Sequence, residues 1–230
     1  MTATQNRLLK ALEAEDLALL EPHLQPMTVH LHQALIPPHR PVDLLYFPLT
    51  GFASVTSSEG GNKIEVGMIG SEGLVGVSVL LGSHSSPFDH FVQVPGEMLS
   101  IDKNAFIAAV ERSVAMRNLF LCFVHTLMAQ TAQTAFANAS FGIEARLARW
   151  LLMCQDRLGD TLVLTHEFLS MMLGVQRTSV TLALQTLEGN GMIRARRGRI
   201  EVRKREGLIE LADVSYGVPE AEYARLIERA

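Results

Sequence analysis

Apolar residues recur at helical spacing in two neighbouring segments of the carboxy-terminal third. They predict one helix over 166–173 and a second over about 176–190. The inward-facing positions are Leu169, Leu173, Val180, Leu184 and Leu187. Thr165 stands where an N-cap is expected, and Gly174 stands between the helices, where a positive φ favours a residue without Cβ. The pattern predicts a helix-turn-helix.

A β-type hairpin follows, and its turn at Gly198 is rich in arginine. The arginines are Arg194, Arg196, Arg197 and Arg199. Residues 146–207 carry a net charge of +5, in a chain whose formal net charge is −4. Two helices and a turn alone would also suit an αα-hairpin in a core. The local positive charge favours the other interpretation, in which the second helix enters a DNA major groove.

The amino-terminal end of the second helix is predicted to be exposed, because its apolar positions lie on the opposite face. The candidate base-reading residues are Gln176, Arg177, Thr178 and Thr181. Arginine is the usual bidentate partner of guanine. The expected partner is therefore double-stranded DNA.

A long segment, 118–143, contains no Lys, Arg, Asp or Glu. Its glutamines and threonines count against a membrane span, because they are costly in lipid without partners. Apolar residues at three-four spacing predict a helix-helix seam instead, and the candidates are Leu121, Val124, Met128 and Ala135. Such an apolar helix does not suit the surface of a monomer. We therefore expect a symmetric homodimer and no membrane association.

The amino-terminal half predicts short strands. After an opening amphipathic helix, seven β-type runs alternate with Gly and Pro turns between about 27 and 101: VHLHQALI, LLYFPL, FASVTSS, KIEVGMIG, LVGVSVLL, HFVQV and EMLSI. A short helix over about 103–111 follows. The expected fold class is α+β: a β-roll, jelly-roll-like (1–112), a long dimerisation helix (113–143) and a winged helix-turn-helix with a carboxy-terminal helix (144–230).

Composition narrows the setting. The chain begins without a secretory signal and has two cysteines, Cys122 and Cys154, in apolar helical contexts. Two buried free thiols in a reducing, cytoplasmic location are expected. No catalytic residues are visible, so the chain is not expected to be an enzyme.

The order of these parts resembles the CRP/FNR family of bacterial transcription regulators over nearly the whole chain. The motifs that carry the resemblance are GSEGLVG at 70–76, RLARWLL at 146–152, LGVQRTSV at 173–180 and RRGRIEV at 196–202. The resemblance implies a homodimer whose two recognition helices enter successive major grooves of a near-palindromic site, with RNA polymerase as a further partner.

The resemblance also implies roles for single residues. Arg177 and Thr178 align with base-contacting positions of the family. The positions that align with phosphate contacts are Thr165, Ser179, Arg196, Arg197 and Arg199. The chain departs from many relatives at Thr178, where they carry Glu, and at Leu182, where they carry Arg, so their half-site is not transferred.

The sequence leaves open whether the protein binds a small-molecule effector, and which one. By resemblance the effector-binding residues are Glu72, Gly73 and Leu74, but the family's phosphate-binding Arg has no counterpart, since no Lys or Arg occurs between Lys63 and Lys103. Unpaired phosphate is costly to bury, so cyclic AMP or GMP is not expected. A helix amino terminus near 72–75 offering N–H groups to an anion stays an alternative.

A second function class also stays open, a cupin-type metal-binding enzyme domain with a DNA-binding tail. His30 and His32 lie two apart on a predicted strand, and His39 or His90 could join them at a metal. No carboxylate follows at the needed spacing, and two thiols are too few for an iron–sulfur cluster. We therefore predict no metal and no cofactor.

Overall fold

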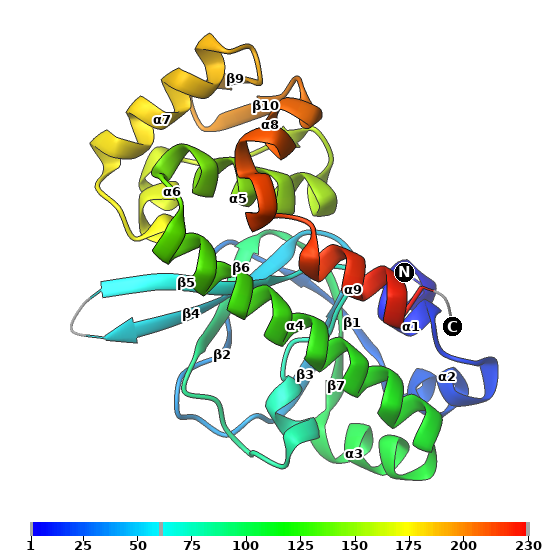
Figure 1. Cartoon of the computed structure of the whole chain (residues 1–230). Helices are drawn as coiled ribbons and strands as arrows, with labels where there is room; N and C mark the ends of the chain where they lie inside the picture. Colours follow the sequence, from blue (N-terminus) through cyan, green and yellow to red (C-terminus); the bar gives the residue numbers. More distant parts are fainter. Residues whose placement is uncertain (1, 60–61, 229–230) are drawn as a thin grey trace. The chain divides into compact units, whose positions relative to one another are not determined.

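The computed structural model describes residues 2–59 and 62–228. The chain forms two compact units. The amino-terminal unit comprises residues 1–56, 67–129 and 220–230, and the carboxy-terminal unit comprises residues 57–66 and 130–219. Each unit is therefore built from segments that are distant in sequence, and Figure 1 labels most of their helices and strands.

Two sheets make up the amino-terminal unit, and they confirm the predicted β-roll. One has the order β1-β7-β3, with β1 (Gln25–Val29), β7 (Gly96–Asp102) and β3 (Leu44–Pro48). The other has the order β2-β6-β4-β5, with β2 (Ala34–Ile36), β6 (Asp89–Val94), β4 (Phe52–Glu59) and β5 (Asn62–Ile69). The buried rings of Phe47, Phe106 and Phe120 lie against one another, with centroids 5.4–6.4 Å apart.

Two of the predicted strands are wrong. The run 74–81 ends in a 3-10 helix, η3 (Val77–Leu81), because Gly76 and Gly82 on either side take positive φ values of 106° and 79°. The run 29–36 is broken by His32, whose φ is 62°. His30 therefore precedes a turn and His32 lies within it, so the two do not share one face of a strand.

The opening amphipathic helix is also interrupted. It divides into η1 (Ala3–Gln5), α1 (Arg7–Lys10), α2 (Ala14–Leu20) and η2 (Glu21–His23). Asn6 causes the first break: its side chain caps α1 by accepting from Leu9 N and donates to the carbonyls of Pro48 and Gly73, at 2.9 and 3.0 Å. An asparagine with no exposed surface thus ties the amino terminus to the β-roll.

Three further helices belong wholly or partly to this unit. The predicted short helix is α3 (Lys103–Arg112), which Asp102 caps by accepting from Asn104 N and Ala105 N. The long helix is α4 (Val114–Ser140), and the last is α9 (Val218–Leu226). The Arg7 guanidinium pairs with Glu228 and lies 4.8 Å from the centroid of the Tyr223 ring, so α1 and α9 are neighbours (Figure 1).

The carboxy-terminal unit holds the remaining elements. They are α5 (Ile143–Leu158), β8 (Thr161–Leu162), α6 (His166–Leu173), α7 (Arg177–Gly189), β9 (Ile193–Arg196), β10 (Arg199–Val202), α8 (Arg205–Ala212) and η4 (Asp213–Ser215). The three strands form a sheet of order β8-β10-β9. The end of the β4–β5 hairpin joins this unit, where Glu65 accepts a 2.9 Å hydrogen bond from the indole N–H of Trp150.

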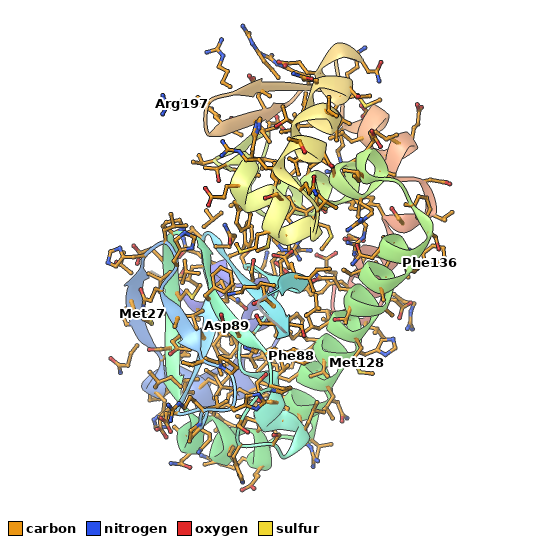
Figure 2. The ribbon with its side chains drawn as sticks, turned by 90° about the vertical axis from the view of Figure 1, so that its left-hand side faces the viewer. Met27, Phe88, Asp89, Met128, Phe136 and Arg197 are labelled. Carbon is orange, nitrogen blue, oxygen red and sulfur yellow. The ribbon has the colours of Figure 1, made fainter. Side chains whose placement is uncertain are left out.

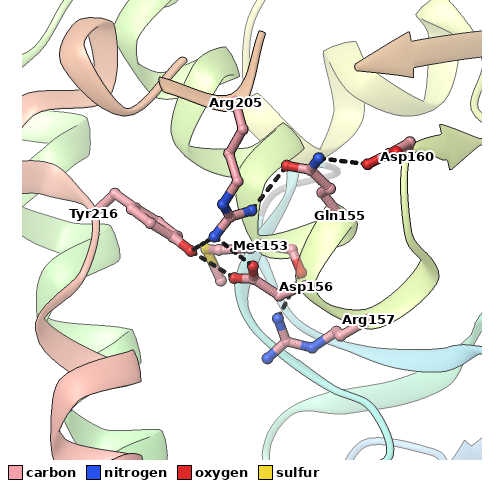
Figure 3. A network of polar contacts seen from close by, with 7 residues as sticks. All are labelled: Met153, Gln155, Asp156, Arg157, Asp160, Arg205 and Tyr216. Carbon is pink, nitrogen blue, oxygen red and sulfur yellow. Dashed lines mark hydrogen bonds and ion pairs between the residues drawn. The ribbon is translucent and has the colours of Figure 1, made fainter. Parts of the chain in front are cut away.

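A polar network fastens α8 and the segment after η4 to the end of α5 (Figure 3). Arg205 donates to Gln155, Asp156 and the Tyr216 hydroxyl, at 2.7–2.8 Å. The Tyr216 hydroxyl donates in turn to Asp156 at 2.7 Å. The two segments that follow the wing are thus fixed to α5 through one carboxylate and one guanidinium.

Both cysteines are free, but only Cys154 is fully buried, and burial raises the pKa of its thiol well above the ordinary value. Cys122 is half-buried, so the expectation of two buried thiols is wrong for that residue. Among residues 2–59 and 62–228, no helix is both long and apolar enough to cross a membrane.

Candidate nucleic-acid interface

The helix-turn-helix forms as its pattern predicts. Thr165 caps α6 by accepting from Phe168 N at 3.2 Å, and Gly174 ends the helix with a φ of 62°. The predicted core positions Val180, Leu184 and Leu187 of α7 are buried. Gly174 takes the left-handed conformation at little cost, which allows a short turn. Only three residues, 174–176, connect α6 to α7.

The amino-terminal end of α7 is exposed, as expected. Gln176 is the N-cap residue, and its side chain makes no capping hydrogen bond. Arg177 and Thr178 are exposed, and Ser179 is half-buried. Within the described parts of the chain, the Arg177 guanidinium has no hydrogen bond and no ion pair. A cation without an internal partner is available to an external acceptor.

Thr181 differs from the expectation. Its hydroxyl donates to the carbonyl of Arg177 at 3.0 Å and lies 3.1 Å from Nδ1 of His166. The side chain is half-buried between α6 and α7. Thr181 therefore joins the two helices, and its polar atom is not directed at an outside partner.

The basic hairpin, β9–β10, is the predicted wing. Gly198 makes its turn with a φ of 71°, and the carbonyl of Gly198 accepts from Leu164 N at 3.1 Å, beside the cap of α6. Glu188 at the end of α7 accepts from Ala195 N at 3.0 Å. The exposed arginines of the wing are Arg194, Arg196, Arg197 and Arg199, and Figure 2 labels Arg197 at its tip.

Arg199 donates to the Thr161 hydroxyl at 3.3 Å, which leaves most of its guanidinium available. The other three wing arginines have no internal polar partner among the described residues. A row of exposed cations forms a positively charged surface on a hairpin that is hydrogen-bonded to α7 and to the segment just before α6. That surface suits phosphate oxygens.

Arg146 contributes to the fold of this interface, a role that sequence reasoning missed. Its guanidinium donates to the carbonyl of Leu173, the last residue of α6. A cation at this end of the helix satisfies an unpaired carbonyl and complements the dipole. Burial lowers the pKa of Arg146, although the guanidinium stays charged.

The candidate effector residues lie in a turn that is already occupied by the chain's own groups. Glu72 accepts from Gly70 N at 3.1 Å, so its carboxylate closes the turn. The N–H groups of Gly73 and Val75 donate to Gly70 and Tyr46 carbonyls, at 3.0 and 2.8 Å. No helix begins within 72–75; the nearest is the short 3-10 helix η3, whose N-cap is Gly76, so these four residues do not form a helix amino terminus.

The ring of Phe123 on α4 fills the space beside this turn. A Cβ added at Gly73 would lie 2.2 Å from the ring, and Phe123 is only 3% exposed. Leu74 is fully buried. Gly73 therefore packs against α4, Leu74 is buried beside it, and Glu72 is half-buried. The charge pattern of the sequence does not reveal this contact. The available signal is the large side chain of Phe123 in the apolar long helix, which needs a small residue such as Gly73 opposite it.

His90 is a poor source of the missing positive charge, and the described histidines form no metal cluster. Burial lowers the pKa of His90, which makes it a poor partner for phosphate. The described residues contain no cluster of three or more His, Cys, Asp or Glu side chains that could hold a metal ion. The cupin-type alternative finds no support in the structure.

The outer face of α4 differs by one residue from the predicted seam. Val124 is 5% exposed and packs inside the unit, so it is not available to a partner helix. Met128 is 65% exposed, and Ala135 is also exposed (Figure 2 labels Met128). The exposed positions at alternating spacings of four and three are Leu121, His125, Met128, Ala132 and Ala135, of which Leu121 is half-buried.

Comparisons with known proteins agree with this arrangement. Residues 145–211 match the Crp-like helix-turn-helix domain. The global nitrogen regulator of Nostoc sp. is 27% identical over 188 residues, which cover 77% of this chain and 84% of that protein.

Solved structures share the fold. FixK2 from Bradyrhizobium japonicum has a TM-score of 0.72 at 14% identity, covering 83% of this chain and 98% of that one. A CRP/FNR-family transcriptional regulator from Thermus thermophilus has a TM-score of 0.66 at 19% identity, covering 82% and 98%. The regulator CLP from Xanthomonas campestris has a TM-score of 0.68 at 17% identity, covering 83% and 99%.

A helix-turn-helix with an unpaired arginine at the head of its second helix, flanked by a cationic wing, defines a DNA-binding protein. The domain match, the related regulator and the shared fold make the class more definite. Residues 145–211 form a Crp-like helix-turn-helix domain, and the chain has the fold of solved CRP/FNR-family transcription regulators.

Proposed function

We propose that the chain acts as a homodimer and recognises a particular, near-palindromic DNA sequence. The observation that carries this proposal is the unpaired Arg177 at the exposed head of α7, next to a wing in which Arg194, Arg196 and Arg197 also have no internal polar partner among the described residues. Because guanidinium groups bind guanine edges and phosphates, the same surface can both position the protein and read sequence.

The contacts divide into two kinds. Arg177, with Gln176 and Thr178 beside it, reads base edges. The residues that position the protein on the phosphates are Thr165, Ser179, Arg196, Arg197 and Arg199. The Thr165 hydroxyl can donate to a phosphate while it accepts from Phe168 N.

Selection of bound duplexes from random DNA tests this function. We expect an enriched motif with two inverted half-sites about one helical turn apart, centre to centre. A scrambled duplex of equal length is the control. If the selected and scrambled duplexes bind equally well at 150 mM salt, a salt concentration of about physiological strength, the protein does not read sequence.

The dimer is proposed to form through the outer face of α4, defined by Leu121, His125, Met128, Ala132 and Ala135. Their spacing is that of the a and d positions of a heptad. The imidazole of His125 lies 3.3 Å from the Glu222 carboxylate of α9, so one polar residue in the seam already has a partner. Recognition of two half-sites requires two linked α7 helices, which this seam would supply.

We also propose that the β-roll does not hold cyclic AMP or cyclic GMP in the way of the family's nucleotide binders. The Glu72 carboxylate and the N–H groups of Gly73 and Val75 have internal partners, and Phe123 fills the adjacent space. An effector, where one acts, is less anionic than a cyclic nucleotide. The c-di-GMP response named for CLP is a property of that protein.

Isothermal calorimetry with cyclic AMP and cyclic GMP checks this prediction. We expect no heat of binding at ligand concentrations up to about 100 µM, roughly 100 times the micromolar Kd that would matter here. Binding at micromolar Kd or tighter would contradict it. RNA polymerase as a partner and a cytoplasmic location rest on the family alone, and co-purification with the polymerase is the direct test.

A further inference from the structure

Leu182 is the most exposed apolar residue of α7. It is 64% exposed, whereas the other aliphatic positions of the helix, Val180, Leu184 and Leu187, are buried. Helical spacing places Thr178, Leu182 and Gln185 on one face, because residues four and seven apart lie nearly above one another. That face is opposite the buried one, and it carries no charge.

The position of Leu182 in α7 is one that would face DNA. Leu182 is the sixth residue of α7, one turn beyond Thr178, and the amino-terminal half of a recognition helix is the part that meets base edges. A leucine cannot form a hydrogen bond with a base or a phosphate. In the major groove the apolar group that it can contact is the C5 methyl of thymine.

Thr181 strengthens this assignment. Its hydroxyl is held by the Arg177 carbonyl and His166, so the neighbouring position does not offer a polar alternative. Single exposed apolar residues are common on protein surfaces, and Val214 in η4 is a comparable case at 60% exposure. Leu182 differs because it lies at the centre of the face that the proposed function directs into the groove.

We infer that Leu182 is a specificity-determining residue that selects a thymine in each half-site by burying its methyl group. This inference rests on the proposed DNA-binding function. Arg177 then reads one base pair by hydrogen bonds, and Leu182 reads another by apolar contact. The chemical class of the recognised group is a 5-methylpyrimidine.

Deoxyuridine in place of thymidine tests the contact, because it removes only the methyl group. Each thymine of the selected site is replaced in turn, symmetrically in both half-sites, and Kd is measured for the wild type, Leu182→Ala and the control Val214→Ala. Equal thermal unfolding of the three proteins shows that each is folded. We expect one position where the wild type and the control lose about fourfold per half-site, the change that corresponds to about 0.8 kcal/mol per methyl-sized group.

At the same position Leu182→Ala should bind the two duplexes nearly equally. The inference is overturned if no thymine shows methyl dependence in the wild type, or if the dependence survives in Leu182→Ala. A selected motif without a Leu182-dependent methyl effect overturns this inference alone. Absence of any selected motif overturns the proposed function as well.

Discussion

Met128→Glu places a carboxylate at the middle of the proposed dimer seam. Met128 is 65% exposed in the single chain, so the substitution leaves the packing of the amino-terminal unit intact. In the proposed dimer, each glutamate would replace an apolar side chain that the seam covers, so the carboxylate would be desolvated. We expect the monomer to stay folded and the dimer to dissociate.

The magnitude follows from that exposure. Fully burying a methionine is worth about 1.5–3 kcal/mol, so burying the exposed two-thirds contributes about 1–2 kcal/mol per protomer. Two protomers give about 2–4 kcal/mol, which raises the dimer dissociation constant by about 30- to 1,000-fold. Desolvation of the two carboxylates adds to this effect.

Sedimentation equilibrium of the wild type, Met128→Glu and Met128→Leu measures the change directly. Met128→Leu keeps the apolar volume and should remain a dimer at micromolar concentration. Met128→Glu should also lose affinity for the full palindrome while it keeps the wild-type affinity for one half-site, since linkage and not contact is lost. A wild type that is monomeric at micromolar concentration, or a Met128→Glu protein that still dimerises like Met128→Leu, refutes the seam.

Three further substitutions address the interface and its support. Arg177→Ala should cost about 1–3 kcal/mol on the selected site and much less on random DNA, as gel-shift titrations of both duplexes would show; an equal loss on both would reduce Arg177 to a phosphate contact. Replacing Arg197 and Arg199 by Ala should weaken binding to every sequence and lower the salt slope by about one for each lost phosphate contact, and an unchanged slope would place the wing away from DNA. Tyr216→Phe removes two hydrogen bonds of 2.7 Å and should lower the free energy of unfolding by about 1–2 kcal/mol in urea titrations, unless water replaces the hydroxyl without loss.

The helix-turn-helix could be predicted almost residue by residue, because local rules decide it. The bounds of α6, its cap Thr165 and the positive φ of Gly174 follow from capping and turn chemistry. The β-roll could be predicted as a class, because evenly spaced short strands with Gly and Pro turns are typical of one. The register and the order β1-β7-β3 depend on contacts between distant segments, which periodicity does not contain.

The errors have physical causes of the same kind. Val124 fits the three-four spacing as well as His125 does, and only the β-roll packed against α4 decides which of the two faces outward. Thr181 looks exposed on a helical wheel, but its hydroxyl finds the Arg177 carbonyl four residues earlier and His166 on the neighbouring helix. Sequence periodicity locates the two faces of a helix and leaves the residues at their borders undecided.

The helix α4 carries both the residue beside the candidate effector turn and the residues of the proposed dimer seam. Phe123 fills the space beside Gly73 from the inner face, and Met128 stands little more than one turn away on the outer face. A ligand entering beside Gly73 would have to displace the Phe123 ring, and a closely packed helix does not yield at one side chain alone. Any such ligand would therefore shift the backbone that carries the dimer seam. In the proposed dimer, the protein's own Phe123 ring would occupy the position from which such a ligand would act on the seam.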